Sequence, residues 1–404
     1  MTSLRAHSAD LLSGALAIQD AHPMQPLLVA EQVADRAYFV SSFANVTALD
    51  TDDGLVLVDT GSFLLADKTR QVLRGVTPRP AIAAIWTHGH VDHCFGVEDY
   101  EREAGHPVRV IAHEAVRRRF ERYELTHGYN QAINARQFQT GAVFPSQFRA
   151  PDETYRDRLA LEVGGRRFEL AHALGETDDA TWVWVPDAGV ACVGDLFIWA
   201  SPNCGNPQKV QRYPREWAQA LRAIDALRPE VLCPGHGVPI WGAAAVHRAL
   251  DETASYLESI VDQVVTLMNR GERLDAILGA VRVADELVRR PYLQPIYDEP
   301  EFIVRNVYRL YGGWWDGNPA HLKPPRDADL ARELADLAGG PLRLADRAEQ
   351  VHDPRLACEL VELASLAAPD DARIRLARQR IYTARRKQER SLMARGIFGT
   401  AAEE

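Results

Sequence analysis

Side chains that can bind metal ions are concentrated in one short segment, Thr87-His88-Gly89-His90-Val91-Asp92-His93. The segment follows an apolar run over residues 81–86, which predicts a buried strand that ends at these side chains. Two histidines at i and i+2 on an extended backbone point the same way, so His88 and His90 can reach one ion. Asp92 and His93 come where the chain turns into a helix and can face a second ion. The alternative is a histidine-rich surface turn, and further ligand-type residues downstream argue against it.

The surrounding sequence predicts an α/β region followed by an all-helical region. From about residue 37 to 240, short β-runs alternate with helices, and glycine or proline turns join predicted hairpins over 158–171 and 182–193. The β-runs stop after residue 240, and residues 243–269 carry apolar side chains at helical spacing. The length also favours two domains. We therefore predict an α+β chain with domains at residues 1–245 and 246–404.

Residues 87–93 resemble the HxHxDH signature of the metallo-β-lactamase superfamily, whose fold is an αββα sandwich. Other landmarks of that family follow in order, namely Leu57-Val58-Asp59-Thr60-Gly61, Val193-Gly194-Asp195 and Pro234-Gly235-His236-Gly237. The resemblance implies that Asp59 orients a ligand, that Asp195 bridges two metal ions and that His236 is the last histidine ligand.

One position departs from the common pattern of this superfamily. Glu176 stands where a histidine usually follows a glycine, and His172 is nearby but out of register. We prefer Glu176 as the ligand. An acidic residue at this position resembles the alkylsulfatase branch of the superfamily. Zinc is expected, and iron or manganese are alternatives because the added carboxylate makes the site richer in oxygen. The predicted metal ligands are His88, His90, Asp92, His93, Glu176, Asp195 and His236.

The helical region carries a second resemblance. Residues 297–306 and 312–319 are similar to the dimerisation domain of alkylsulfatases, which implies a homodimer. The sterol-carrier-like domain that follows in those sulfatases has no counterpart before Glu404, so short or bulky organic groups are expected in preference to long alkyl chains.

The chemistry expected of this site is hydrolysis. A water between two Zn²⁺ ions would have its pKa lowered from ~15.7 toward roughly 7, and Asp92 and Asp195 are the predicted catalytic side chains. The loop after Asp195 is expected to bind the substrate. Its donors would suit an anionic group, although a solvated polar loop is the alternative. The predicted substrate-binding residues are Asn203, Asn206, Lys209 and Arg212.

Charge and composition exclude several kinds of partner. The chain of 404 residues has a formal net charge of -10, which argues against nucleic acid and against an anionic membrane surface. No apolar run is long enough for a transmembrane helix. Five cysteines form no paired framework, and residues 11–18 lack a convincing signal-peptide cleavage site. We therefore expect a cytoplasmic protein.

The leading hypothesis is a two-metal hydrolase acting on a sulfate ester of a small or medium organic group. The alternatives are a carboxyl-ester, thioester or lactone hydrolase, a mono-iron oxygenase, and a non-catalytic metal-stabilised scaffold.

Overall fold

The computed structural model describes residues 3–139, 141 and 143–403. The chain forms two compact units. The first comprises Met1–Thr126, Pro145–Gly271 and Ile277–Tyr311, and the second comprises His127–Phe144, Glu272–Ala276 and Gly312–Glu404. The two compact units therefore do not coincide with the two domains predicted from the sequence. Helix α8 (Ala243–Asn269), which follows the predicted boundary at residue 245, packs on α7 (Pro214–Asp225) and on strands of the first unit. The boundary between domains at residue 245 stays a prediction.

The first sheet of the first unit has seven strands in sequential order. Its first four strands form an antiparallel meander, and the next three continue in parallel. All four side chains of Leu55–Val58 are buried, as a continuous apolar run predicts for a central strand. The strands are β1 (Val29–Ala34), β2 (Ala37–Ser41), β3 (Val46–Asp50), β4 (Leu55–Val58), β5 (Ala81–Ile85), β6 (Arg109–His113) and β7 (Glu153–Tyr155).

The second sheet has six strands in the order β13-β12-β11-β10-β9-β8. Both predicted hairpins are confirmed, and Gly164 and Gly165 make the first turn with positive φ, which glycine adopts without strain. Strands β11 and β12 are parallel, and α7 lies between them in the chain. The strands are β8 (Arg158–Val163), β9 (Arg166–Ala173), β10 (Ala180–Val185), β11 (Val190–Gly194), β12 (Val231–Pro234) and β13 (Ile240–Trp241).

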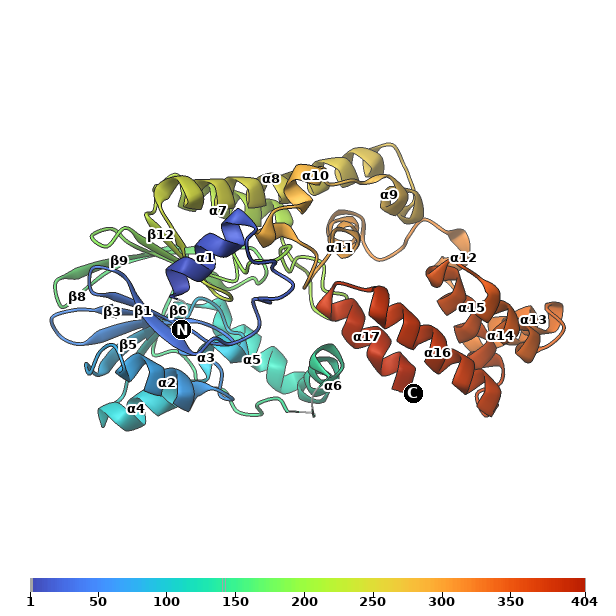
Figure 1. The fold of residues 1–404 in the computed structure, drawn as a ribbon, viewed down its shortest axis with the longest axis horizontal. Coiled ribbons are helices and arrows are strands. Elements are labelled where there is room, and N and C mark those ends of the chain that lie inside the picture. Colours follow the sequence, from blue (N-terminus) through green and yellow to red (C-terminus); the bar gives the residue numbers. More distant parts are fainter. Residues whose placement is uncertain (1–2, 140, 142, 404) are drawn as a thin grey trace. The chain divides into compact units, whose positions relative to one another are not determined.

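Helices cover both sheets of the first unit, which confirms the αββα sandwich (Figure 1). Helices α2 (Ala66–Arg74) and α4 (Val97–Ala104) contact the first sheet, while α7 and α8 contact the second. In α8 the predicted apolar stripe is buried at Leu257, Ile260 and Val264. The other helices are α1 (Leu4–Ser13), α3 (Val91–Cys94), α5 (Ala115–Leu125), α10 (Asp285–Val288), the 3₁₀ helix η1 (Pro291–Leu293) and α11 (Pro300–Gly312); α9 (Leu274–Ala280) is divided between the two units.

The second unit is helical among its described residues, as predicted for this region. Its core is formed by apolar side chains of successive helices, including Leu344, Val361 and Ile374. Helix α6 (His127–Phe138) comes from within the α/β part of the sequence and packs on the last helix of the chain. The remaining helices are α12 (Pro319–Leu322), α13 (Asp327–Leu337), α14 (Pro341–Gln350), α15 (Pro354–Ala367), α16 (Ala372–Gln388) and α17 (Leu392–Glu403).

Among the helices that the structure describes, none combines the length and the apolar character needed to span a bilayer.

Candidate metal centre

Four strands of the first unit end at the same cluster of side chains. In the first sheet, β4 and β5 are parallel and lead into Asp59 and His88. In the second sheet, β11 and β12 are parallel and lead into Asp195 and His236. Parallel strands present their carboxyl ends at one edge of a sheet, which is where α/β proteins usually place a site. Each pair of strands thus brings together residues that are distant in sequence.

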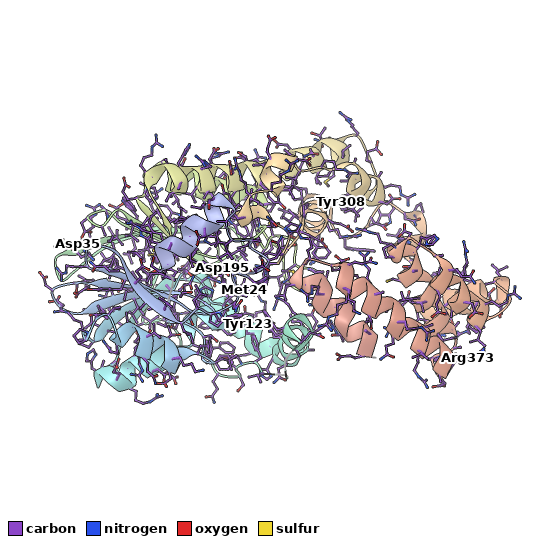
Figure 2. All side chains as sticks on the ribbon, viewed as in Figure 1. Met24, Asp35, Tyr123, Asp195, Tyr308 and Arg373 are labelled. Atoms are coloured by element: carbon purple, nitrogen blue, oxygen red, sulfur yellow. The ribbon has the colours of Figure 1, made fainter. Side chains whose placement is uncertain are left out.

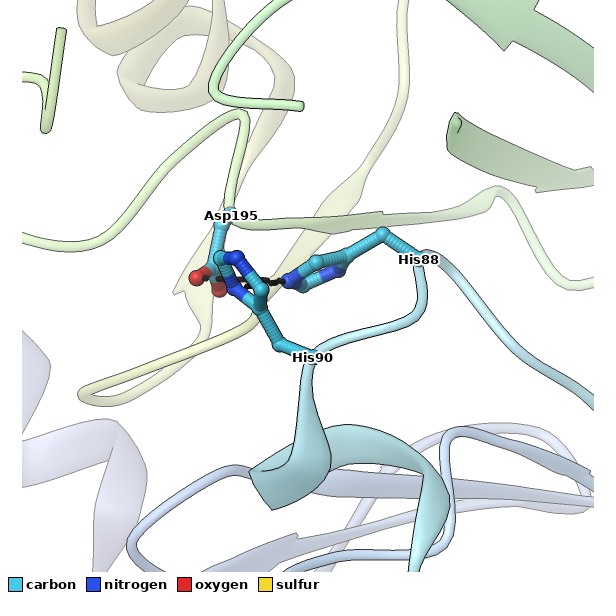
Figure 3. Close-up of side chains that lie close together, drawn as sticks. All are labelled: His88, His90 and Asp195. Atoms are coloured by element: carbon cyan, nitrogen blue, oxygen red, sulfur yellow. Dashed lines mark hydrogen bonds and ion pairs between the residues drawn. The ribbon is translucent and has the colours of Figure 1, made fainter. Parts of the chain in front are cut away.

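The first group of ligand-type side chains is His88, His90 and Asp195, whose candidate ligand atoms all lie within 4.8 Å of one another (Figure 3). His88 Nε2 is 2.8 Å from His90 Nδ1 and 3.7 Å from Asp195 Oδ2. This spacing confirms that two histidines at i and i+2 point to the same side.

The second group is Asp92, His93 and His236, which meets the same distance limit. Asp195 Oδ1 lies 3.3 Å from His93 Nε2 and 3.5 Å from His236 Nε2. The two carboxylate oxygens of Asp195 therefore face different groups, which is the arrangement that a bridging ligand requires. Asp195 is labelled in Figure 2.

Asp59 orients two histidines from a backbone with φ 58°. Its Oδ1 accepts from Thr87 N at 2.7 Å, and its Oδ2 accepts from the Thr87 hydroxyl at 2.7 Å. Because the single hydroxyl proton of Thr87 goes to the carboxylate, its oxygen must accept from His88 Nδ1, 3.0 Å away. This fixes the proton on Nδ1 and leaves the Nε2 lone pair of His88 directed at the centre.

In His93 and His236, too, a hydrogen bond fixes the proton on Nδ1. His93 Nδ1 donates to Asp59 Oδ2 at 2.8 Å, and His236 Nδ1 donates to the backbone carbonyl of Phe43. Both rings therefore turn Nε2 toward Asp195. The role that the resemblance implied for Asp59, orienting ligands from outside the centre, matches these contacts.

The protonation of the histidines reflects their surroundings. Burial lowers the pKa of His88 to about 3, and the nearby His93 adds to this effect. Burial likewise lowers the pKa of His90 well below its usual value. Burial also opposes protonation of His93 and His236, but neighbouring carboxylates, led by Asp195, raise the pKa of both rings. The first group thus holds neutral imidazoles, the form that binds metals.

Glu176 lies beside these groups rather than within either. Its Oε1 is 2.8 Å from Arg212 Nη1 and accepts from Asn203 Nδ2. Burial raises the pKa of the Glu176 carboxyl well above its usual value; the Asp195 carboxylate adds to this and Arg212 opposes it. His172, the alternative ligand, belongs to neither group and stacks on His113 with ring centroids 3.7 Å apart.

Unsatisfied atoms show that the residues fit a pair of metal ions. His93 Nε2, Asp195 Oδ1 and Glu176 Oε2 are buried and have no hydrogen-bond partner among the described residues. Buried polar atoms are rarely left in that state, and a cation bound among these three side chains would give each atom a partner. Imidazole nitrogens combined with carboxylate oxygens suit zinc, and also iron or manganese.

The four predicted substrate-binding residues do not share one environment. Asn203, Asn206 and Arg212 are buried, and the Asn206 side chain accepts from Gln208 N at 3.0 Å. Asn203 and Arg212 both donate to Glu176, and Arg212 Nη1 also donates to the Glu176 carbonyl. Lys209 is half-buried; burial, with Arg212 as the next cause, lowers its pKa to about 8. Contact with a substrate stays a prediction for all four.

Three residues near the centre were not predicted from the sequence. Tyr297 is buried, and burial together with the carboxylates of Glu176 and Asp92 raises the pKa of its phenol. Asp298 accepts from Gly205 N in the loop after Asp195. Asn306 Oδ1 accepts from Arg212 N at 3.2 Å, and its Nδ2 donates to Arg212 O at 3.1 Å. About a hundred positions separate these residues from the loop, so no spacing rule could have joined them.

Comparisons with known proteins agree with this architecture. Residues 41–236 match the metallo-β-lactamase superfamily, and residues 274–404 match the alkylsulfatase dimerisation family. The chain is 28% identical to a linear primary-alkylsulfatase of Pseudomonas sp. (strain ATCC 19151), over 72% of this chain and 60% of that protein. It is 26% identical to an (R)-specific secondary-alkylsulfatase of Pseudomonas sp., over 74% of this chain and 50% of that protein.

A solved structure shows the same fold. The stereoselective inverting sec-alkylsulfatase Pisa1 from Pseudomonas sp. aligns with a TM-score of 0.82 at 24% identity, covering 93% of this chain and 65% of that one. The chain thus spans between half and two thirds of the length of these relatives. It combines a metallo-β-lactamase domain with an alkylsulfatase dimerisation domain, and its curated homologues are alkylsulfatases.

Proposed function

We propose that this chain is a metal-dependent hydrolase of sulfate esters. The observation that carries the proposal is the position of Asp195, whose two oxygens face two separate groups of ligand-type side chains. The relatives named as alkylsulfatases favour a sulfate ester as the substrate of such a centre. The size of its organic group stays a prediction.

We assign one cation to His88, His90 and Glu176 and the other to Asp92, His93 and His236, with Asp195 shared. Glu176 joins the first set because it stands where related sequences place a further histidine ligand, and its buried Oε2 has no hydrogen-bond partner among the described residues. A pair of bound divalent cations supplies Lewis-acid chemistry and activates water as a nucleophile at neutral pH. Zinc is the proposed metal, and elemental analysis of the purified protein distinguishes it from iron and manganese.

Side chains of this chain would orient the nucleophile and hold the substrate. The Asp92 side chain is 21% exposed, whereas the His93 and His236 rings beside it are buried, so Asp92 can accept a hydrogen bond from an attacking water. Lys209 interacts with both Glu176 and Asp92 and supplies a positive charge on the approach to the centre. The Tyr297 phenol remains protonated at neutral pH and can donate to a sulfate oxygen.

Purified protein should be assayed with sulfate, phosphate and carboxyl esters that carry the same chromogenic leaving group. We expect turnover of the sulfate ester that is lost with a chelator, restored by metal, and lost in Asp195→Asn. A matched control is Asp178→Asn, which removes a carboxylate with a 42% exposed side chain outside both ligand groups. Turnover of the carboxyl ester with none of the sulfate ester would refute the substrate assignment and favour the acyl-hydrolase alternative.

We also propose a homodimer formed through the region that matches the alkylsulfatase dimerisation family. Light scattering should give twice the 45.0 kDa chain mass at micromolar concentration. A monomer under those conditions would contradict the proposal.

A further inference from the structure

A buried ion pair lies directly beneath the turn that carries His88 and His90. Arg119 of α5 and Asp179, which precedes β10, have side-chain exposures of 2% and 0%. Arg119 Nε lies 2.6 Å from Asp179 Oδ2, and Arg119 Nη2 lies 2.8 Å from Asp179 Oδ1. The guanidinium therefore grips both oxygens of the carboxylate, the most directional form of this contact.

The turn rests on this pair. Asp179 Oδ2 accepts the backbone N–H of Gly89 at 3.0 Å, and Gly89 stands between the two histidines. A Cβ at Gly89 would lie 2.9 Å from Arg119 Cδ and 3.0 Å from Asp179 Oδ2. The backbone of the turn thus approaches the ion pair as closely as a residue without a side chain allows.

The same pair reaches a second ligand. Asp179 lies three residues after Glu176 in the connection between β9 and β10. The Asp179 carboxylate, paired with Arg119, therefore holds one end of the segment 176–179. The other end is held at Glu176, which pairs with Arg212. The Asp179 carboxylate, held by Arg119, thus anchors the His88–His90 turn, and Arg212 anchors the segment that carries Glu176.

Stability alone does not account for a buried ion pair at this place. The desolvation of two charges can exceed their attraction, and well-packed apolar residues are often at least as stabilising. The hydrogen bond from the Gly89 N–H to Asp179 is what an apolar pair could not provide.

We propose that Arg119 and Asp179 are positioning residues, which fix the His88-Gly89-His90 turn so that both imidazoles and Glu176 address one metal ion. The inference rests on the proposed metal centre but not on the identity of the ester. Loss of such a partner behind metal ligands typically weakens metal affinity by about 10–100-fold.

Metal affinity should be measured by competition with a chromophoric chelator, together with urea unfolding of the metal-free protein. In Asp179→Asn we expect one of the two metal equivalents to bind about 10–100-fold more weakly, with the other unchanged. Asp178→Asn is the matched control, because Asp178 bonds to the same guanidinium but its side chain is 42% exposed. Both equivalents should bind to this control as to the wild type.

A double variant separates positioning from folding, since Asp179→Asn alone leaves a buried guanidinium poorly paired. Arg119→Met/Asp179→Leu removes both charges but also the acceptor of the Gly89 N–H, so its metal-free form should unfold at a higher urea concentration than that of Asp179→Asn while one metal equivalent still binds weakly. Wild-type affinity for both equivalents in the double variant would overturn the inference. So would a metal-free double variant that is less stable than Asp179→Asn, because the charged pair would then serve the fold. Wild-type protein that binds no metal would instead refute the metal centre itself.

Discussion

Lys209 should make the capture of an anionic substrate depend on pH in a way that no other predicted substrate-binding residue can. Burial, with Arg212 as the next cause, lowers the pKa of Lys209 to about 8. With that pKa, the ammonium is roughly nine-tenths charged at pH 7 and roughly one-tenth charged at pH 9. Cations bound at the neighbouring Glu176 and Asp92 would lower this pKa further, so kcat/KM for a sulfate ester should fall by at least about tenfold across this range.

Two variants test whether deprotonation of Lys209 causes this decline in kcat/KM. Lys209→Arg keeps a positive charge at every accessible pH, so kcat/KM should lose its decline between pH 7 and 9. Lys209→Met should lower kcat/KM already at pH 7, by about 10–100-fold, because a hydrogen bond to a charged group contributes roughly 1.5–3 kcal/mol.

The assay is the pH profile of kcat/KM for one sulfate ester, measured at constant ionic strength with saturating metal. Inhibition by inorganic sulfate, measured in parallel, reports the same charge without a chemical step. If the profile of Lys209→Arg declines as steeply as that of the wild type, another group titrates and the reasoning about Lys209 is wrong.

Three further predictions concern the surroundings of the centre. Arg212→Gln should destabilise the metal-free protein by about 1–3 kcal/mol in urea unfolding, because it removes a charged donor from the buried Glu176, and it should also weaken the binding of one metal equivalent; unchanged stability would contradict this. Burial raises the pKa of Asp298 to about 7, so the folded protein favours the protonated acid. As the pH rises from about 4 to 7, the free energy of unfolding of the wild type should therefore fall relative to that of Asp298→Asn, by at most about 4 kcal/mol. A stability difference that does not vary with pH would exclude this titration. Removing metal with a chelator should lower the urea midpoint of the wild type but have less effect on Asp195→Asn, whereas equal shifts would argue against a shared carboxylate.

Local patterns in the sequence predicted the strands, the hairpins and the long helix, and they located four side chains of the centre. The strand 55–58, the two hairpins and the helix 243–269 each carry a periodicity or turn signal that lies within the element itself. Residues 88–93 supply four side chains of the centre from one segment, so their proximity needs little more than a strand end and a helix start. The resemblance to the metallo-β-lactamase superfamily then located Asp195 and His236, which the structure brings to the same place.

Tertiary structure alone decided the partners of these residues. Arg212 is predicted to bind the substrate, and the fold adds a contact between its Nη1 and Glu176, 36 positions earlier in the chain. Asp179 and Arg119 are 60 positions apart, and each would be expected at the surface from its type alone. A buried charge is tolerated only because packing supplies its counter-charge from elsewhere in the chain, and such long-range pairing leaves no periodic trace in the sequence.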